Sequence, residues 1–177
     1  MDLNFTIKTY DELTKRTRDI LIESYRKYYE SIYGIDAFDA FLKVTKRESN
    51  LFDNKITSIK KYSNNYLRAL NAIKEDIVLI LFYNSEGDLI GSSRVIKNRV
   101  LDVVFNNLSK KEEREYWQEV IKFIEKELKK NKYKKMYIEI PLKEGPLLVR
   151  ANNLGFIEDP NDIVIGKEIT YTLNKDI

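Results

Sequence analysis

The alternation of apolar and polar positions is clearest between residues 100 and 156. Residues 100–106 (VLDVVFN) and 133–141 (YKKMYIEIP) alternate with a period of two, which predicts two strands. Residues 109–130 place an apolar side chain at every third or fourth position, which predicts a helix between them. A short helix over residues 145–156 follows. Because two strands joined by about 20 helical residues form a crossover unit, we expect these strands to be parallel neighbours.

The predicted helix over residues 109–130 carries its own start and stop signals. Ser109 and Glu112 have the spacing of a capping box, in which each side chain satisfies a free amide of the other. Asn131 suits the left-handed conformation that ends many helices. One apolar stripe with helical spacing should pack on the sheet: Trp117, Val120, Ile121, Ile124 and Leu128.

The N-terminal part of the chain predicts one strand and several helices. Residues 4–8 (NFTIK) alternate, and residues 11–33 predict a tyrosine-rich helix that stops before Gly34. Residues 36–74 suggest two more helices, without a glycine or proline to mark a domain boundary. Because tyrosine rings pack inward while their hydroxyls stay in water, the first helix could border a cleft or be a half-exposed core helix.

An antiparallel meander precedes the crossover unit. Residues 77–84 (IVLILFYN) form a nearly continuous apolar run, which predicts a strand covered on both faces. Gly87 suits a hairpin turn, after which residues 89–96 return antiparallel and lead into residues 100–106. Two short terminal strands are predicted over residues 163–165 and 169–173.

Composition limits the chemistry available to the chain. Its 177 residues, 43% of them hydrophobic and 33% charged, predict one globular domain spanning residues 1–177. The sequence contains no cysteine and no histidine. Disulfides, thiol nucleophiles, Ser-His triads and zinc sites of the usual ligand types are therefore excluded, and we expect no metal site.

Charge and hydropathy limit the kinds of binding partner and the cellular location that we expect. The formal net charge is +3, from 31 basic and 28 acidic side chains that are dispersed along the chain, so we do not expect nucleic-acid binding. The longest apolar run, residues 77–83, is too short to span a membrane, and no signal peptide is evident. We therefore expect a cytoplasmic protein. A monomer and a homodimer both remain open.

The order of predicted elements resembles the GNAT superfamily of acyl-coenzyme A dependent N-acyltransferases. Three features carry the resemblance: LIGSSRVI after the Gly87 hairpin, the crossover from VLDVVFN to YIEIP, and Leu154-Gly155-Phe156 after a short helix. The resemblance implies an α/β (α+β) fold. Its mixed sheet would combine an antiparallel meander with a parallel crossover pair that is splayed at one end, and helices would cover both faces.

The resemblance also implies a cofactor, acetyl-coenzyme A or a related acyl-coenzyme A, between the two parallel strands. Backbone groups there would bond the pantetheine arm, and the helix start at residues 108–113 would hold the pyrophosphate. The residues implied in cofactor binding are Val103, Val104, Phe105, Lys110, Lys111 and Arg114. For the three basic residues, a solvated charged face is the alternative.

Two carboxylates stand nearest the implied gap, Asp102 on the first crossover strand and Glu139 on the second. Either could act as general base towards an amine acceptor, directly or through water. The alternative for each is a plain solvent-facing position on its strand. A small-molecule or peptide amine would approach from the early helices. The residues expected to contact it are Tyr25, Tyr29, Tyr33 and Phe38, which could equally belong to the core.

The sequence departs from the family pattern at two places. The expected phosphate loop has two glycines, whereas residues 110–117 read KKEEREYW, and their glutamates would repel phosphate. Ala151 stands where many relatives have a tyrosine that protonates the leaving thiolate. Two hypotheses therefore stand side by side: an N-acyltransferase, and a protein that keeps the fold, has lost cofactor binding and serves as a binding or regulatory module.

Overall fold

The computed structural model describes residues 2–9, 12–33, 77–141, 143–158 and 170–177. The helices predicted over residues 36–74, the strand predicted over residues 163–165, and Phe38 lie outside the described residues.

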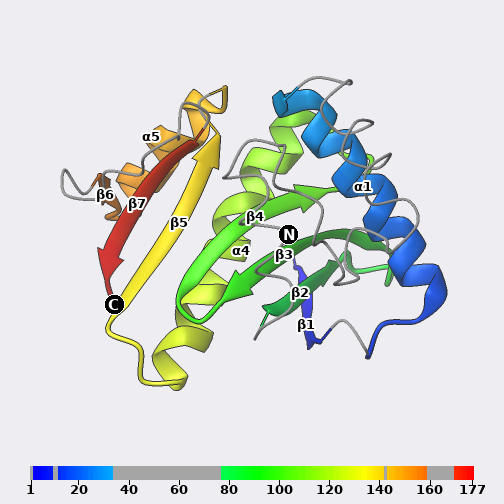
Figure 1. The fold of residues 1–177 in the computed structure, drawn as a ribbon, viewed down its shortest axis with the longest axis horizontal. Coiled ribbons are helices and arrows are strands. Elements are labelled where there is room, and N and C mark those ends of the chain that lie inside the picture. The colour runs from blue at the N-terminus through cyan, green and yellow to red at the C-terminus, as the bar shows by residue number, and fades with distance from the viewer. Residues whose placement is uncertain (1, 10–11, 34–76, 142, 159–169) are drawn as a thin grey trace, which may run out of the picture.

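Among these residues, seven strands form one mixed sheet (Figure 1). The strands are β1 (Asn4–Lys8), β2 (Ile77–Tyr83), β3 (Leu89–Ile96), β4 (Arg99–Phe105), β5 (Lys135–Pro141), β6 (Ile157–Glu158) and β7 (Thr170–Asp176). Their order across the sheet is β1-β2-β3-β4-β5-β7-β6. Neighbouring strands are antiparallel except for β4 and β5, which are parallel. Both the meander and the parallel crossover predicted from the sequence are confirmed.

Helices cover both faces of the sheet, as predicted. They are α1 (Lys15–Tyr33), α4 (Lys110–Lys130) and α5 (Gly145–Asn153). Figure 1 shows α1 on one face and α4 with α5 on the other. Helix α1 begins later than the predicted residue 11. The hydroxyl of Thr14 accepts a hydrogen bond from the Thr17 amide at 3.2 Å, which fixes the helix start at this point.

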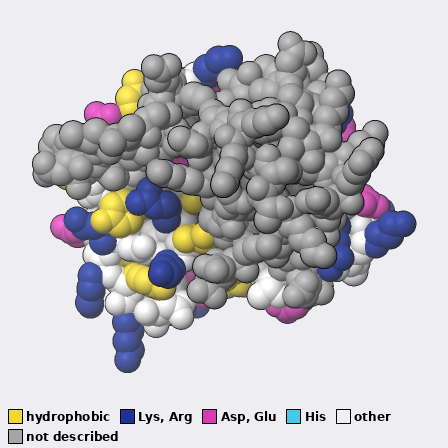
Figure 2. Space-filling view, in the orientation of Figure 1, with side chains coloured by type: hydrophobic (Ala, Val, Ile, Leu, Met, Phe, Trp, Pro, Cys, Tyr) yellow, Lys and Arg dark blue, Asp and Glu magenta, His cyan; other side chains and the backbone are white. Residues whose placement is uncertain are grey.

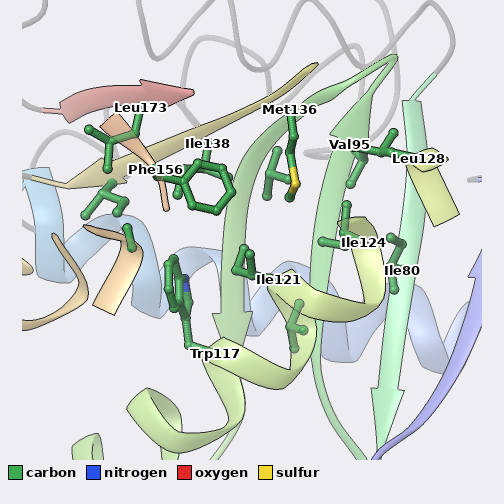
Figure 3. Packing of buried hydrophobic residues seen from close by; sticks show 14 of the residues in the cluster. Ile80, Val95, Trp117, Ile121, Ile124, Leu128, Met136, Ile138, Phe156 and Leu173 are labelled. Atoms are coloured by element: carbon green, nitrogen blue, oxygen red, sulfur yellow. The ribbon is translucent and has the colours of Figure 1, made fainter. Parts of the chain in front are cut away.

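Helix α4 supplies most of the core on its face. Ser109 and Glu112 form the predicted capping box, and all five residues of the predicted apolar stripe are buried. Figure 3 shows Trp117, Ile121 and Ile124 turned towards the strands. The prediction for Asn131 is wrong, because its φ is −84° and the following Lys132 takes the left-handed conformation instead, with φ 65°.

The C-terminal part of the sheet differs in detail from the prediction. Strand β7 continues to Asp176, three residues beyond the predicted end, and pairs with β5 along its whole length. Strand β6 has only two residues, too few for an alternation to reveal it. Gly87 and Gly155 both have positive φ, 88° and 91°, as expected for the hairpin turn and the end of α5.

A β-bulge explains why β4 leaves β5. The strands pair only at Arg99 with Tyr137 and at Val100 with Ile138. Across β3, Arg94 pairs with Asp102 but Val95 pairs with Val100, so Leu101 is an extra residue in β4. Because such a bulge bends and twists its strand, β4 turns away directly after its last pair with β5. Figure 1 shows the two strands diverging towards their C-terminal ends, which confirms the splayed pair.

The described surface is mixed in charge. On the part of the face that Figure 2 describes, Lys and Arg side chains stand apart, separated by hydrophobic and other polar surface. None of the helices in the described ranges is long and apolar enough to cross a membrane.

Gly91 of β3 gives a test of the packing in the meander. A Cβ added there would lie 2.5 Å from the Phe82 ring and 2.5 Å from the Val104 carbonyl oxygen, and that carbonyl belongs to the neighbouring strand. We expect Gly91→Ala to lower the free energy of unfolding by about 2–3 kcal/mol, measured by urea denaturation. Gly145→Ala is the control, because its added Cβ meets nothing within 4 Å. Equal stability of the two variants would contradict the described packing.

Candidate active site

A cavity of about 320 Å³ lies where β4 and β5 part. This volume is at the lower end of the range for small-molecule sites. Five elements contribute to its lining: the ends of β4 and β5, the first turns of α4, one side of α1, and the start of α5. The lining residues used below are Ser24, Lys27, Tyr28, Ser31, Val103, Phe105, Lys110, Glu113, Arg114, Trp117, Glu139, Ile140, Glu144 and Leu147.

The part of the cavity between the strands is apolar and has free backbone groups. Val103 and Phe105 of β4 and Ile140 of β5 line it, with Trp117 of α4. Pairing between the two strands ends at Val100 and Ile138, so the backbone amides and carbonyls beyond these residues have no ladder partner on the facing strand. Unpaired backbone groups on both sides of a narrow apolar slot suit an extended ligand that contains amides. Val104, by contrast, is buried and does not line the cavity.

One stripe of α1 forms the opposite wall. Ser24, Lys27, Tyr28 and Ser31 are spaced by three, one and three residues, so they share one side of the helix and all line the cavity. Tyr29 and Tyr33 belong to α1, but their side chains lie outside the described structure, as Phe38 does. Of the α1 tyrosines whose side chains the structure describes, Tyr28 lines the cavity and Tyr25 does not.

Tyr25 lies in the core instead, in a buried cluster with Asp102 and Arg94. Its hydroxyl donates to Asp102 Oδ1 at 2.8 Å, and its ring lies 4.8 Å from the Arg94 guanidinium carbon. Arg94 donates from Nε to Asp102 Oδ2 at 2.7 Å and forms an ion pair with it through Nη2. All three side chains are buried, so the solvent-facing alternative for Asp102 is wrong. The cluster joins α1 to β3 and β4 and thereby sets the position of the α1 wall.

Of the two predicted carboxylates, Glu139 is the one that reaches the cavity. Its side chain is 17% exposed, and Oε1 lies 3.4 Å from Nη1 of Arg99. Arg99 also lies over the Tyr137 ring at 4.8 Å, which holds the guanidinium next to the point where the strands part. A partly buried carboxylate at the wall of a small cavity has the location that a general base requires. Asp102 does not line the cavity.

Opposite charges meet at the mouth of the cavity. Lys110 Nζ lies 2.8 Å from Glu113 Oε2 and 3.4 Å from Glu144 Oε1, which links the first turn of α4 to the start of α5. Partial burial lowers the pKa of Lys110, but the hydrogen bonds and charges of Glu113 and Glu144 outweigh it, so the pKa is raised above its ordinary value of 10.5. Lys111 is exposed and does not line the cavity.

Arg114, one turn further along α4, lines the same cavity without an acidic partner in the described parts of the chain. Its Nε is buried and has no hydrogen-bond partner there. Leaving a buried donor unpaired costs about 1–3 kcal/mol. A ligand with an acceptor oxygen at this point would remove that cost, so Arg114 is a candidate ligand-binding residue.

The slot between the strands and the start of α4 differ in how well they fit the two parts of coenzyme A, the pantetheine arm and the diphosphate. The apolar slot with unpaired strand backbone fits a pantetheine arm. The start of α4 does not fit a diphosphate, because the Ser109 amide donates to Glu112 Oε2 at 2.9 Å and the Glu112 amide donates to Ser109 Oγ at 3.3 Å. These donors would otherwise be free for an anion. Glu113 and Glu144 add negative charge beside them.

Comparison with solved structures identifies the fold. No protein-family model matches the chain, and no curated protein matches its sequence. The chain is similar to the PaiA N-acetyltransferase of Thermoplasma acidophilum in complex with coenzyme A, with 15% identity, a TM-score of 0.55 and 100% of each chain covered. It is also similar to a GCN5-related N-acetyltransferase of Rhodopseudomonas palustris, with 10% identity, a TM-score of 0.57 and coverage of 98% and 95%.

The chain is also similar to an N-acetyltransferase of Staphylococcus aureus, with 14% identity and a TM-score of 0.51. The match covers 99% of this chain and 98% of that one. Likeness at these identities concerns the fold. The chain has the fold of the GNAT superfamily of N-acetyltransferases, as the order of its elements predicted.

Replacement of Tyr25 tests the buried cluster. Tyr25→Phe keeps the ring but removes the donor to the buried Asp102 carboxylate, so we expect the free energy of unfolding to fall by about 1.5–3 kcal/mol. Urea denaturation measures the change. Tyr116→Phe serves as control, because the Tyr116 ring packs near Phe105 while its hydroxyl makes no hydrogen bond within the described residues. A Tyr25→Phe protein as stable as wild type would contradict the anchoring role.

The contribution of the Lys110 ion pairs to stability can be tested at alkaline pH. Because its pKa is raised in the folded state, its ion pairs contribute stability that is fully present below pH 10.5 and is lost as the pH rises through the folded pKa. We expect Lys110→Met to be less stable than wild type at pH 8, by under about 1 kcal/mol because the side chain is largely exposed. The difference should shrink by pH 11.5 in urea denaturation. Lys111→Met, which removes an exposed neighbour, should show no such convergence.

Proposed function

We propose that the protein is an N-acyltransferase that moves an acyl group, acetyl in the simplest case, from a pantetheine thioester to an amine. The observation that carries the proposal is the cavity between β4 and β5, which has an apolar slot on one side and the Glu139 carboxylate on the other. The GNAT fold supports it, and one structural neighbour with that fold is a complex with coenzyme A.

The residues that line the cavity would have different roles in this reaction. The bound thioester would supply an activated acyl carbon. Val103, Phe105 and Ile140 would exclude water from the slot, so that hydrolysis is suppressed. Glu139 would take the proton from the amine as its nitrogen bonds to the acyl carbon and the carbon–sulfur bond breaks, with the sulfur leaving as thiolate. Asp102 would act only by holding α1 in position, because its carboxylate is already bound to Arg94 and Tyr25.

The acceptor would enter from the α1 side of the sheet. Ser24, Tyr28 and Ser31 supply hydroxyl groups along that wall, and Glu139 attracts a cationic amine before deprotonation. This wall suits a small-molecule or peptide amine. A cytoplasmic location and a monomeric or homodimeric state stay predictions from the sequence.

A second candidate function is a binding or regulatory module that has kept the fold and lost the cofactor. The observation in its favour is the start of α4, where the capping box and the Lys110 ion pairs occupy groups that a diphosphate would need. The two candidates differ in one measurable property. A transferase binds acyl thioesters in the slot, whereas the module does not.

Calorimetric titration with acetyl-coenzyme A, followed by a transfer assay with a set of amines, tests the proposed function. The chain has no cysteine, so thiol released from the donor can be measured with Ellman's reagent without background from the protein. Saturable heat and amine-dependent thiol release would support the transferase. Absence of heat and of thermal stabilisation at millimolar thioester would leave the binding module as the function.

Glu139→Gln tests the general base. The amide keeps the size and a polar contact to Arg99 but cannot accept the proton, so we expect the transfer rate to fall about 10²–10⁴-fold at saturating substrate. Binding of acetyl-coenzyme A should be unchanged in calorimetry. Glu86→Gln, in the exposed β2–β3 hairpin, is the control. A Glu139→Gln enzyme with wild-type rate would remove Glu139 from this role.

A further inference from the structure

At the start of α4, the capping box places the Glu112 carboxylate over the Ser109 and Glu112 amides. Glu112 accepts hydrogen bonds from both the amide and the hydroxyl of Ser109, at 2.9 and 2.7 Å. The Ser109 hydroxyl in turn accepts from the Glu112 amide. These bonds lower the pKa of Glu112, which keeps its carboxylate charged at neutral pH. A phosphate group would therefore meet a negative charge and two occupied amides, those of Ser109 and Glu112, at the place where a helix start usually attracts it.

The nearest lysine is also occupied. Lys110 faces two carboxylates, Glu113 of α4 and Glu144 directly before α5, and both line the cavity. A ligand phosphate would have to displace one or both of them before it could use this ammonium group. Lys110 would therefore add little affinity for the adenosine diphosphate end of coenzyme A.

Arg114 differs from Lys110 in having no acidic partner among the described residues. It lies one turn further along α4 and lines the cavity, and its buried Nε has no acceptor within the described ranges. A guanidinium group in this position can bind the oxygens of one phosphate. Only Lys27, on the α1 wall, adds another basic side chain to the described lining besides Arg114 and Lys110.

We infer that the donor is recognised by its pantetheine arm and a single phosphate at Arg114, so that a 4′-phosphopantetheine thioester is as good a ligand as acyl-coenzyme A. This inference rests on the proposed function, since it takes the slot to be the thioester site. It specifies the donor class: thioesters that end in one phosphate, without a required nucleotide.

Calorimetry with three probes on the full chain tests the inference. The probes are S-acetyl-pantetheine, S-acetyl-4′-phosphopantetheine and acetyl-coenzyme A. We expect the first phosphate to tighten binding about tenfold, which corresponds to one charged hydrogen-bonded contact. The nucleotide should change the dissociation constant by less than about threefold. Binding of acetyl-coenzyme A ten times tighter than the phosphopantetheine thioester would overturn the inference but not the proposed function. Failure of all three probes to bind would overturn both.

Substitutions at Arg114 test whether this side chain causes the difference in affinity between the pantetheine and phosphopantetheine thioesters. Arg114→Met should remove the advantage of phosphopantetheine over pantetheine, and Arg114→Lys should keep part of it. Lys126→Met, an exposed lysine further along the same helix, should leave all three affinities unchanged. Circular dichroism checks that each variant is folded. If Arg114→Met retains the full phosphate step, the assignment to Arg114 is wrong.

The carboxylates at the mouth are tested by the double variant Glu113→Gln with Glu144→Gln. Freed Lys110 should then favour acetyl-coenzyme A over the phosphopantetheine thioester by about tenfold, a preference that wild type lacks. No change in this ratio would contradict the occupation of Lys110 by Glu113 and Glu144.

The same phosphopantetheine thioester occurs free and as the prosthetic arm of a carrier protein. An acetylated carrier protein, titrated beside the free thioester, separates these sources. Tighter binding of the carrier-bound arm supports a protein-delivered donor, and tighter binding of the free arm supports a small-molecule donor. Both results agree with recognition of a single phosphate.

Discussion

Two residue pairs join β4 to β5, and the shortness of this pairing is the constraint on which the cavity depends. Were the strands paired along their length, their backbone groups would bond each other and no slot would open between them. The extra residue Leu101 prevents this by bending β4 directly after Val100. Helix α4 then provides the floor of the opening, because its buried stripe is held to the sheet by the same strands that part above it.

The second requirement is a fixed position for α1, and polar groups meet it together with apolar ones such as the buried Leu21. Arg94 and Asp102 lose their hydration on burial, which an ion pair alone rarely offsets. Tyr25 supplies a further hydrogen bond and a ring face to the same pair. Hydrogen bonds are directional, whereas apolar contacts tolerate sliding along the helix axis. This buried cluster therefore holds the α1 stripe in one register against the cavity.

Local sequence patterns predicted the helices and strands because hydrophobic periodicity, helix caps and turn glycines act over a few residues. The apolar stripe of α4, the Ser109 cap and the turn at Gly87 could all be recognised in the sequence. The parting of the strands came from the family resemblance, since nothing in residues 99–105 signals that Leu101 is an extra residue. The site was harder. Alternation placed Asp102 and Glu139 on strands. It could not tell that Asp102 forms a fully buried ion pair with Arg94 of the neighbouring strand, whereas Glu139 pairs with the partly exposed Arg99 at the cavity. Likewise, burial of Tyr25 but not of Tyr28 depends on how α1 is rotated on the sheet, which composition does not reveal.

The capping box of α4 also limits how this chain could be engineered or could have diverged. Installing glycines at positions 112 and 113 to make a phosphate-binding loop would delete the carboxylate that caps the helix and one of the two that hold Lys110. Under the proposed mode of donor recognition, Glu112 and Glu113 would therefore favour helix stability and disfavour nucleotide binding. A variant selected for tight nucleotide binding would need compensating mutations elsewhere in α4 before it could fold as well as its parent.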